Sequence, residues 1–64
     1  MPVIAVTMAP TSEKTRKELI QGLTEKAVEI TNIPKQAFLI TISELPETSL
    51  GCGGQTIEEM KKAL

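Results

Sequence analysis

The segment EKTRKELIQGLTEKAVEIT, residues 13–31, decides the fold of this chain. Its apolar residues recur at intervals of three and four, which places them on one side of an α-helix. These residues are Leu19, Leu23, Ala27 and Ile30. The spacing therefore predicts a helix over residues 13–31 whose apolar stripe lies against another part of the chain.

Residues on either side of this segment are typical of helix ends. Thr11 or Ser12 can cap the N-terminus, and Glu13 lies where a negative charge is favourable. Asn32 readily adopts the left-handed conformation that ends many helices, and Pro34 prevents the helix from continuing. Local signals thus bound the predicted helix at both ends.

Two β-strands are predicted outside the helix. Residues 2–8, PVIAVTM, are apolar at consecutive positions, which is typical of a strand covered on both faces. Residues 37–44, AFLITISE, show an alternation typical of a strand with two different faces. We expect Phe38, Ile40 and Ile42 to share one of these faces.

The element lengths fit a single βαβ unit of the α/β class. A 19-residue helix spans about 28 Å and an eight-residue strand about 26 Å, so the helix can return the chain and make the strands parallel. The crossover is expected to be right-handed. Because one helix covers only one face of a two-stranded sheet, we expect a homo-oligomer to cover the other face and the edges.

The C-terminal part is predicted to hold a turn and a short tail. Residues 50–54, LGCGG, are rich in glycine and predict a tight hairpin or bend. Residues 56–64 carry Ile57, Met60 and Leu64 at a weak helical spacing, so a short packed or frayed helix is expected.

Composition restricts the class of protein. With 64 residues, one domain over residues 1–64 is predicted. Cys52 is the only cysteine and histidine is absent, which excludes an internal disulfide and the usual zinc sites. A net charge of −1 and a single aromatic residue, Phe38, disfavour nucleic-acid binding. No segment reads as a signal peptide or a membrane span, so a soluble cytoplasmic protein without membrane contact is predicted.

Four sequence features occur in a recognisable order. Met1 and Pro2 open the first strand, LIQGLTEKAVEI lies in the helix, ITISE lies in the second strand, and a GxGG element occupies residues 51–54. In their order and spacing, which cover nearly the whole chain, these features resemble the 4-oxalocrotonate tautomerase family, and the chain is identified as a divergent member of it.

The resemblance implies both an architecture and a chemistry. It implies a βαβ subunit with a C-terminal hairpin, assembled as dimers and usually as a homohexamer, a trimer of dimers. It also implies that Met1 is removed and that Pro2 then acts as a general base on a small keto/enol acid. Members of this family use no metal or organic cofactor.

An N-terminal proline suits this chemistry. Proton abstraction beside a carbonyl needs a base that is largely neutral near pH 7. An apolar pocket disfavours the charged form of an amine and so lowers its pKa. The apolar residues after Pro2 can supply such surroundings. The same amine could instead attack a carbonyl as a nucleophile, so both roles stay open.

The chain departs from the family pattern at three positions. The resemblance places the family's two substrate-binding arginines at Thr11 and Leu39, and a pocket phenylalanine at Leu50. We expect Thr11, Leu39 and Leu50 to line the substrate pocket, with helix capping or ordinary packing as the alternatives. Without the arginines, the protein is predicted to act poorly on dicarboxylates and better on a monocarboxylate or apolar keto/enol compound.

Three other side chains have both a chemical and a structural interpretation. Arg16 can reach a pocket, including one in a neighbouring subunit, but snorkelling over the start of the helix is preferred. Glu44 can assist acid–base chemistry, although an exposed carboxylate at a strand end is favoured. Cys52 is not expected to be a nucleophile, because no histidine can activate it.

Two other functions stay open beside the preferred one, an isomerase of the tautomerase type. Pro2 could serve a hydratase, dehalogenase or decarboxylase, although related enzymes of those kinds keep cationic residues that cannot be placed here. The chain could instead be a non-catalytic βαβ assembly or binding module. The absence of both arginines is the best support for this last interpretation.

Overall fold

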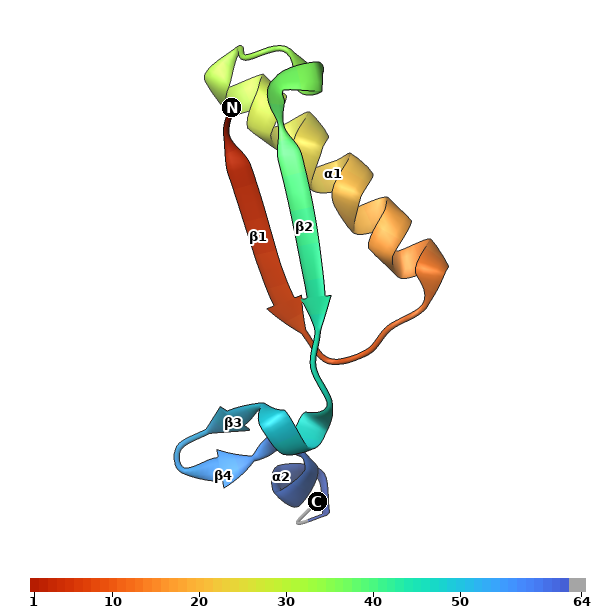
Figure 1. Ribbon diagram of the computed structural model, residues 1–64, viewed down its shortest axis with the longest axis vertical. Coiled ribbons are helices and arrows are strands. Elements are labelled where there is room, and N and C mark those ends of the chain that lie inside the picture. The colour runs from red at the N-terminus through yellow and green to blue at the C-terminus, as the bar shows by residue number, and fades with distance from the viewer. Residues whose placement is uncertain (63–64) are drawn as a thin grey trace.

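The computed structural model describes residues 1–62 and has a parallel βαβ unit at its centre. Strand β1 (Val3–Met8) leads into helix α1 (Glu13–Thr31), which returns the chain to strand β2 (Leu39–Glu44). The two strands pair in parallel, from Val3 opposite Leu39 to Met8 opposite Glu44. Figure 1 shows α1 running obliquely behind this two-stranded sheet.

Helix α1 begins and ends at the residues that the sequence predicts. The Ser12 side chain accepts a hydrogen bond from the backbone N–H of Thr15 at 3.1 Å, so Ser12 rather than Thr11 is the N-cap. Asn32 is left-handed, with φ 60°, and its N–H donates to the carbonyl of Val28 at 2.8 Å. Both caps satisfy backbone groups that have no partner within the helix.

Both strands are shorter than predicted at their N-terminal ends. A 3₁₀-helix, η1 (Lys35–Ala37), takes Ala37 out of the predicted strand. Pro2 precedes β1, where its missing N–H costs no ladder bond. Its carbonyl nevertheless accepts a hydrogen bond from the backbone N–H of Leu39 at 3.0 Å, which fixes Pro2 beside the start of β2.

Only one face of the sheet is covered within the subunit. The side chains on the face toward α1 are half-buried: Ile4, Val6, Met8, Ile40 and Ile42. The opposite face is exposed at Val3, Ala5 and Leu39, and no residue from 1 to 62 is fully buried. The expected burial of β1 on both faces is therefore not reached in a single subunit.

The predicted apolar stripe of α1 is wrong at Ile30, which is exposed. The other predicted stripe residues, Leu19, Leu23 and Ala27, are half-buried, and Val28 rather than Ile30 is half-buried near the end of the helix. Because α1 crosses the sheet at an angle, the side of the helix that meets the strands changes along its length (Figure 1).

The C-terminal part forms a small unit that stands apart from the sheet (Figure 1). It contains the 3₁₀-helix η2 (Glu47–Ser49), strand β3 (Gly51–Cys52), strand β4 (Gln55–Thr56) and helix α2 (Ile57–Lys62). The antiparallel hairpin confirms the predicted turn. The weak helix predicted over residues 56–64 is present as α2, while residues 63 and 64 lie outside the described residues.

The subunit is extended as a result. Its radius of gyration is 14.9 Å, whereas a compact chain of this length would have a value of about 11 Å. Within the part of the chain that the structure describes, no helix is both long and apolar enough to cross a membrane.

Candidate active site

Pro2 and Leu39 lie together at one end of the sheet, where both parallel strands begin. Pro2 is half-buried, and its carbonyl is the acceptor for the N–H of Leu39. Leu39 pairs with Val3 on the uncovered face and is 47% exposed. Pro2 is thus held next to the start of β2, at the edge of the uncovered sheet face.

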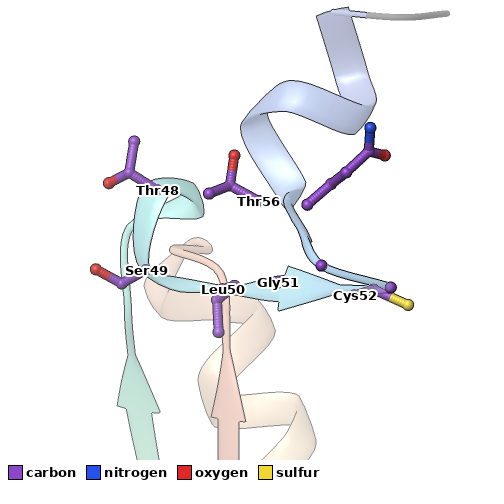
Figure 2. Close-up of a pocket in the computed structure, with 9 residues that line it drawn as sticks. Thr48, Ser49, Leu50, Gly51, Cys52 and Thr56 are labelled. Carbon is purple, nitrogen blue, oxygen red and sulfur yellow. The ribbon is translucent and has the colours of Figure 1, made fainter.

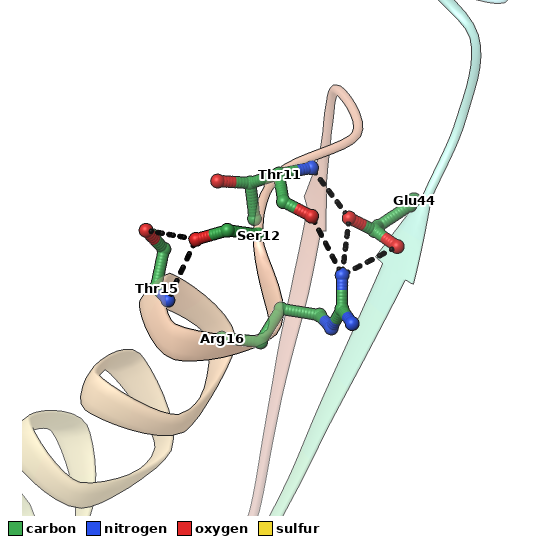
Figure 3. Close-up of polar contacts among 5 residues, drawn as sticks. All are labelled: Thr11, Ser12, Thr15, Arg16 and Glu44. Carbon is green, nitrogen blue, oxygen red and sulfur yellow. Dashed lines mark hydrogen bonds and ion pairs between the residues drawn. The ribbon is translucent and has the colours of Figure 1, made fainter.

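Thr11 lies at the opposite end of the sheet, in a cluster with Arg16 and Glu44 that we call the clamp (Figure 3). The Thr11 N–H donates to Glu44 Oε2 at 2.6 Å, and Arg16 Nη1 donates to the Thr11 carbonyl at 2.7 Å. Arg16 Nη1 also contacts Glu44 Oε1 and Oε2 at 3.1 and 3.0 Å. The clamp therefore ties the β1–α1 loop to the end of β2.

The clamp changes the chemistry expected of Glu44. The backbone N–H of Thr11, with the Arg16 guanidinium as a further cause, holds the pKa of Glu44 below its ordinary value of 4.5. A carboxylate stabilised in its charged form is a poor proton donor at neutral pH. Glu44 is an exposed residue at the end of β2, as predicted, but its side chain is only 29% exposed because its carboxylate is ion-paired with Arg16.

The structure confirms the prediction that the Arg16 side chain extends over the N-terminal end of α1. The side chain runs back past the start of α1 to the Thr11 carbonyl. Its partner Glu44 is not apparent from the sequence, because 28 residues separate the two and no local pattern joins them. The signal that could have found the pair is the parallel strand arrangement, which brings the ends of β1 and β2 together.

Leu50 lies in the C-terminal unit, away from the other predicted site residues. It borders an open pocket of about 370 Å³ that is lined by residues 48–56 (Figure 2). The Leu50 side chain points away from Thr48 and Thr56 in this view, and its carbonyl accepts a hydrogen bond from Ile57 at 2.8 Å. Cys52, at the end of the hairpin, is a free and exposed thiol.

One subunit does not bring the four predicted site residues together. Pro2 and Leu39 lie at the start of the strands, Thr11 lies at their far end, and Leu50 lies beyond it. The six residues of β1 span about 20 Å, too far for groups at its two ends to contact one small molecule. A pocket containing these residues therefore requires more than one subunit. Among residues 1–62, no group of three or more histidine, cysteine, aspartate or glutamate side chains is arranged to hold a metal ion.

Comparison with known proteins adds an independent observation. The sequence matches the family model described as tautomerase enzyme over residues 2–60. No curated protein sequence matches the chain significantly.

Several solved structures share the fold. An apo structure of an unfused 4-OT is 32% identical, with a TM-score of 0.88, and the match covers 92% of this chain and 98% of the other. TomN, a 4-oxalocrotonate tautomerase homologue of the tomaymycin biosynthetic pathway, is 27% identical, with a TM-score of 0.92 and 95% of each chain covered. A heterohexamer 4-oxalocrotonate tautomerase from Chloroflexus aurantiacus J-10-fl is 26% identical, with a TM-score of 0.88 and coverage of 94% and 98%.

Proposed function

Because the chain belongs to the tautomerase family, whose model matches residues 2–60, we propose that it interconverts the keto and enol forms of a small 2-keto acid. Pro2 is the general base in this proposal, and it acts through its free secondary amine after Met1 is removed. The reaction uses no cofactor.

The position of Pro2 is the observation that carries this proposal. Pro2 is half-buried at the start of the sheet, beside the apolar side chains of Val3 and Leu39. Once a second subunit covers these side chains, such surroundings would disfavour a charged amine and favour a neutral, basic nitrogen. The hydrogen bond from Leu39 to the Pro2 carbonyl fixes the ring against the strand, which orients its nitrogen.

The side chains at the expected pocket positions support a monocarboxylate rather than a dicarboxylate substrate. Thr11, Leu39 and Leu50 offer no positive charge of their own. Leu39 and Leu50 instead present branched apolar surface that suits the hydrocarbon part of a keto acid. We assign these three residues to the walls of a pocket shared between subunits.

A homo-oligomer completes the proposed site. The uncovered sheet face and the extended shape leave apolar surface that a second copy can bury. We propose a homohexamer built as a trimer of dimers, with a dimer as the smaller alternative. The free exposed thiol of Cys52 fits a reducing compartment, so we assign the protein to the cytoplasm.

The proposed base is tested first by intact-mass measurement, which is expected to show loss of one methionine. The second test is the rate at which the enol of phenylpyruvate becomes its keto form. Pro2→Ala is expected to lower kcat/KM by about 100-fold, the lower range for general base catalysis. Pro46→Ala replaces a proline in the C-terminal unit and serves as the matched control.

Two results would refute this function. A protein that retains Met1 has an amide at Pro2 and no free base. Equal rates for the wild type and Pro2→Ala would favour the non-catalytic binding module, which the uncharged residues at positions 11 and 39 also support.

A further inference from the structure

We propose that Arg16 binds the carboxylate of the substrate and that this single cation selects substrates with one carboxylate. The proposal rests on the proposed function, because it assigns the acid group of the same keto acid. It gives Arg16 a binding role in addition to its place in the clamp.

Arg16 differs from every other cation of the chain in its burial. It is the only arginine, and its side chain is 33% exposed. All six lysines are exposed, and Lys14, on the same turn of α1, is 86% exposed. A partly desolvated cation interacts with an anion more strongly than an exposed one does, because water screens it less.

The guanidinium of Arg16 keeps one of its edges available. Nη1 makes all of the contacts to Thr11 and Glu44. Within residues 1–62, Nε and Nη2 have no hydrogen-bond partner, and Figure 3 shows them on the side of the group away from Glu44. Two parallel N–H groups in this arrangement can bind a carboxylate through both of its oxygens.

The clamp also orients this edge in advance. Arg16 Nη1 is fixed between the Thr11 carbonyl at 2.7 Å and the Glu44 carboxylate at 3.0 Å. An arginine already held in place loses less conformational freedom when it binds a ligand than a free side chain would. Glu44 repels an incoming anion, however, so its charge weakens carboxylate binding while its position favours it.

The location of Arg16 requires a second copy of the chain. The clamp lies at the far end of the sheet from Pro2 of the same subunit. In this proposal, Arg16 therefore acts on a substrate held at the Pro2 of another subunit. Lys35 is the other cation that could bind the substrate carboxylate, because it lies in η1 just before β2, at the same end of the sheet as Pro2.

Titration with cinnamate, an unreactive aryl carboxylate, tests this assignment on the whole protein. We expect Arg16→Gln to raise the dissociation constant by at least about tenfold, the loss of a charge-assisted bidentate contact. Arg16→Lys keeps the charge but loses the two-nitrogen edge, so an intermediate increase is expected. Lys35→Gln, the matched control, is expected to change the constant by less than about twofold.

Glu44→Gln separates binding from a purely structural role. Glutamine at position 44 keeps an oxygen that can accept from the Thr11 N–H and from Arg16 but has no charge to repel an anion. If Arg16 binds the carboxylate, Glu44→Gln is therefore expected to lower the dissociation constant for cinnamate. A purely structural clamp predicts that Arg16→Gln and Glu44→Gln weaken binding alike, which would overturn the proposal. Absence of cinnamate binding to the wild type, or a loss on Lys35→Gln as large as that on Arg16→Gln, would overturn it as well.

Kinetics then distinguish failure of this inference from failure of the proposed function. The enol of phenylpyruvate and that of its methyl ester share one carbon framework but differ in the carboxylate charge. Arg16→Gln is expected to lower kcat/KM for the acid by at least about tenfold and to leave the ester within about twofold. Equal losses on acid and ester would overturn the role of Arg16, whereas insensitivity to Pro2→Ala refutes the proposed base without affecting the cinnamate result.

Discussion

Arg16 joins the β1–α1 loop to the end of β2 through a single nitrogen atom. Interactions of this kind decide how far the sequence could predict individual residues. The caps at Ser12 and Asn32 were predictable, because each depends on neighbours within four positions. The contact between Arg16 and Glu44 was not, because it depends on how two distant strand ends meet.

The clamp makes stability depend on pH in acid. The pKa of Glu44 is lowered in the folded protein, first by the Thr11 N–H and also by Arg16. Because the unfolded state then binds more protons between the two pKa values, the clamp contributes fully above the ordinary value of 4.5, and its contribution is lost as pH falls through the lower folded value. We expect the urea concentration at the midpoint of unfolding to decrease as the pH falls below 4.5.

Glu44→Gln is expected to remove part of that decrease, since it leaves no carboxylate to protonate. Glu18→Gln is the control, because Glu18 is an exposed helix residue 3.8 Å from Lys14. If both variants kept the full acid dependence of the wild type, Glu44 would not be its source.

At the scale of elements, the pattern of apolar residues predicted the helix better than the strands. Helix α1 has the predicted bounds because its caps and its period agree. The strand predictions extended too far because periodicity does not mark a 3₁₀ turn such as Lys35–Ala37. In the hairpin, Gly53 and Gly54 have positive φ, which explains why glycine stands at both positions.

Gly22 offers a stability test within α1. It lies in the helix interior, and a Cβ atom there would meet no atom within 4 Å. Gly22→Ala is therefore expected to stabilise the helix by about 1 kcal/mol, the difference in helix propensity. Differential scanning calorimetry would then show a higher Tm.

Gln21→Ala changes the neighbouring exposed position between two good helix formers, so it serves as the control. A lower Tm for Gly22→Ala would mean that the hollow lined by Leu19, Gly22 and Leu23 is filled in the assembly.

At the scale of the molecule, the α/β class and the parallel pairing were predictable from element lengths alone. The arrangement of the site was not. Thr11, Leu39 and Leu50 lie in three separate parts of one subunit, and the sequence carries no signal for the contacts between copies. Val3, Ala5 and Leu39 stay exposed on the sheet face that no part of the described subunit covers.

A charge placed on this face tests the assembly. Ala5 is exposed on the uncovered side of β1, opposite Thr41. If a second copy covers it, Ala5→Glu buries an unpaired carboxylate, which costs several kcal/mol or forces the subunits apart. Light scattering after gel filtration is expected to show a smaller species for Ala5→Glu and an unchanged mass for Gln21→Glu on α1. An unchanged mass for both would mean that the face stays open to water.

The clamp holds residue 11 only by its backbone. Glu44 accepts from the Thr11 N–H and Arg16 donates to the Thr11 carbonyl, so neither bond involves the threonine side chain. Every amino acid except proline, which lacks the N–H, can make both bonds. Position 11 is thus a place where descendants of this sequence can exchange side chains without altering the course of the loop, so a library randomised at this codon would test the proposed contact between residue 11 and the substrate on a constant scaffold.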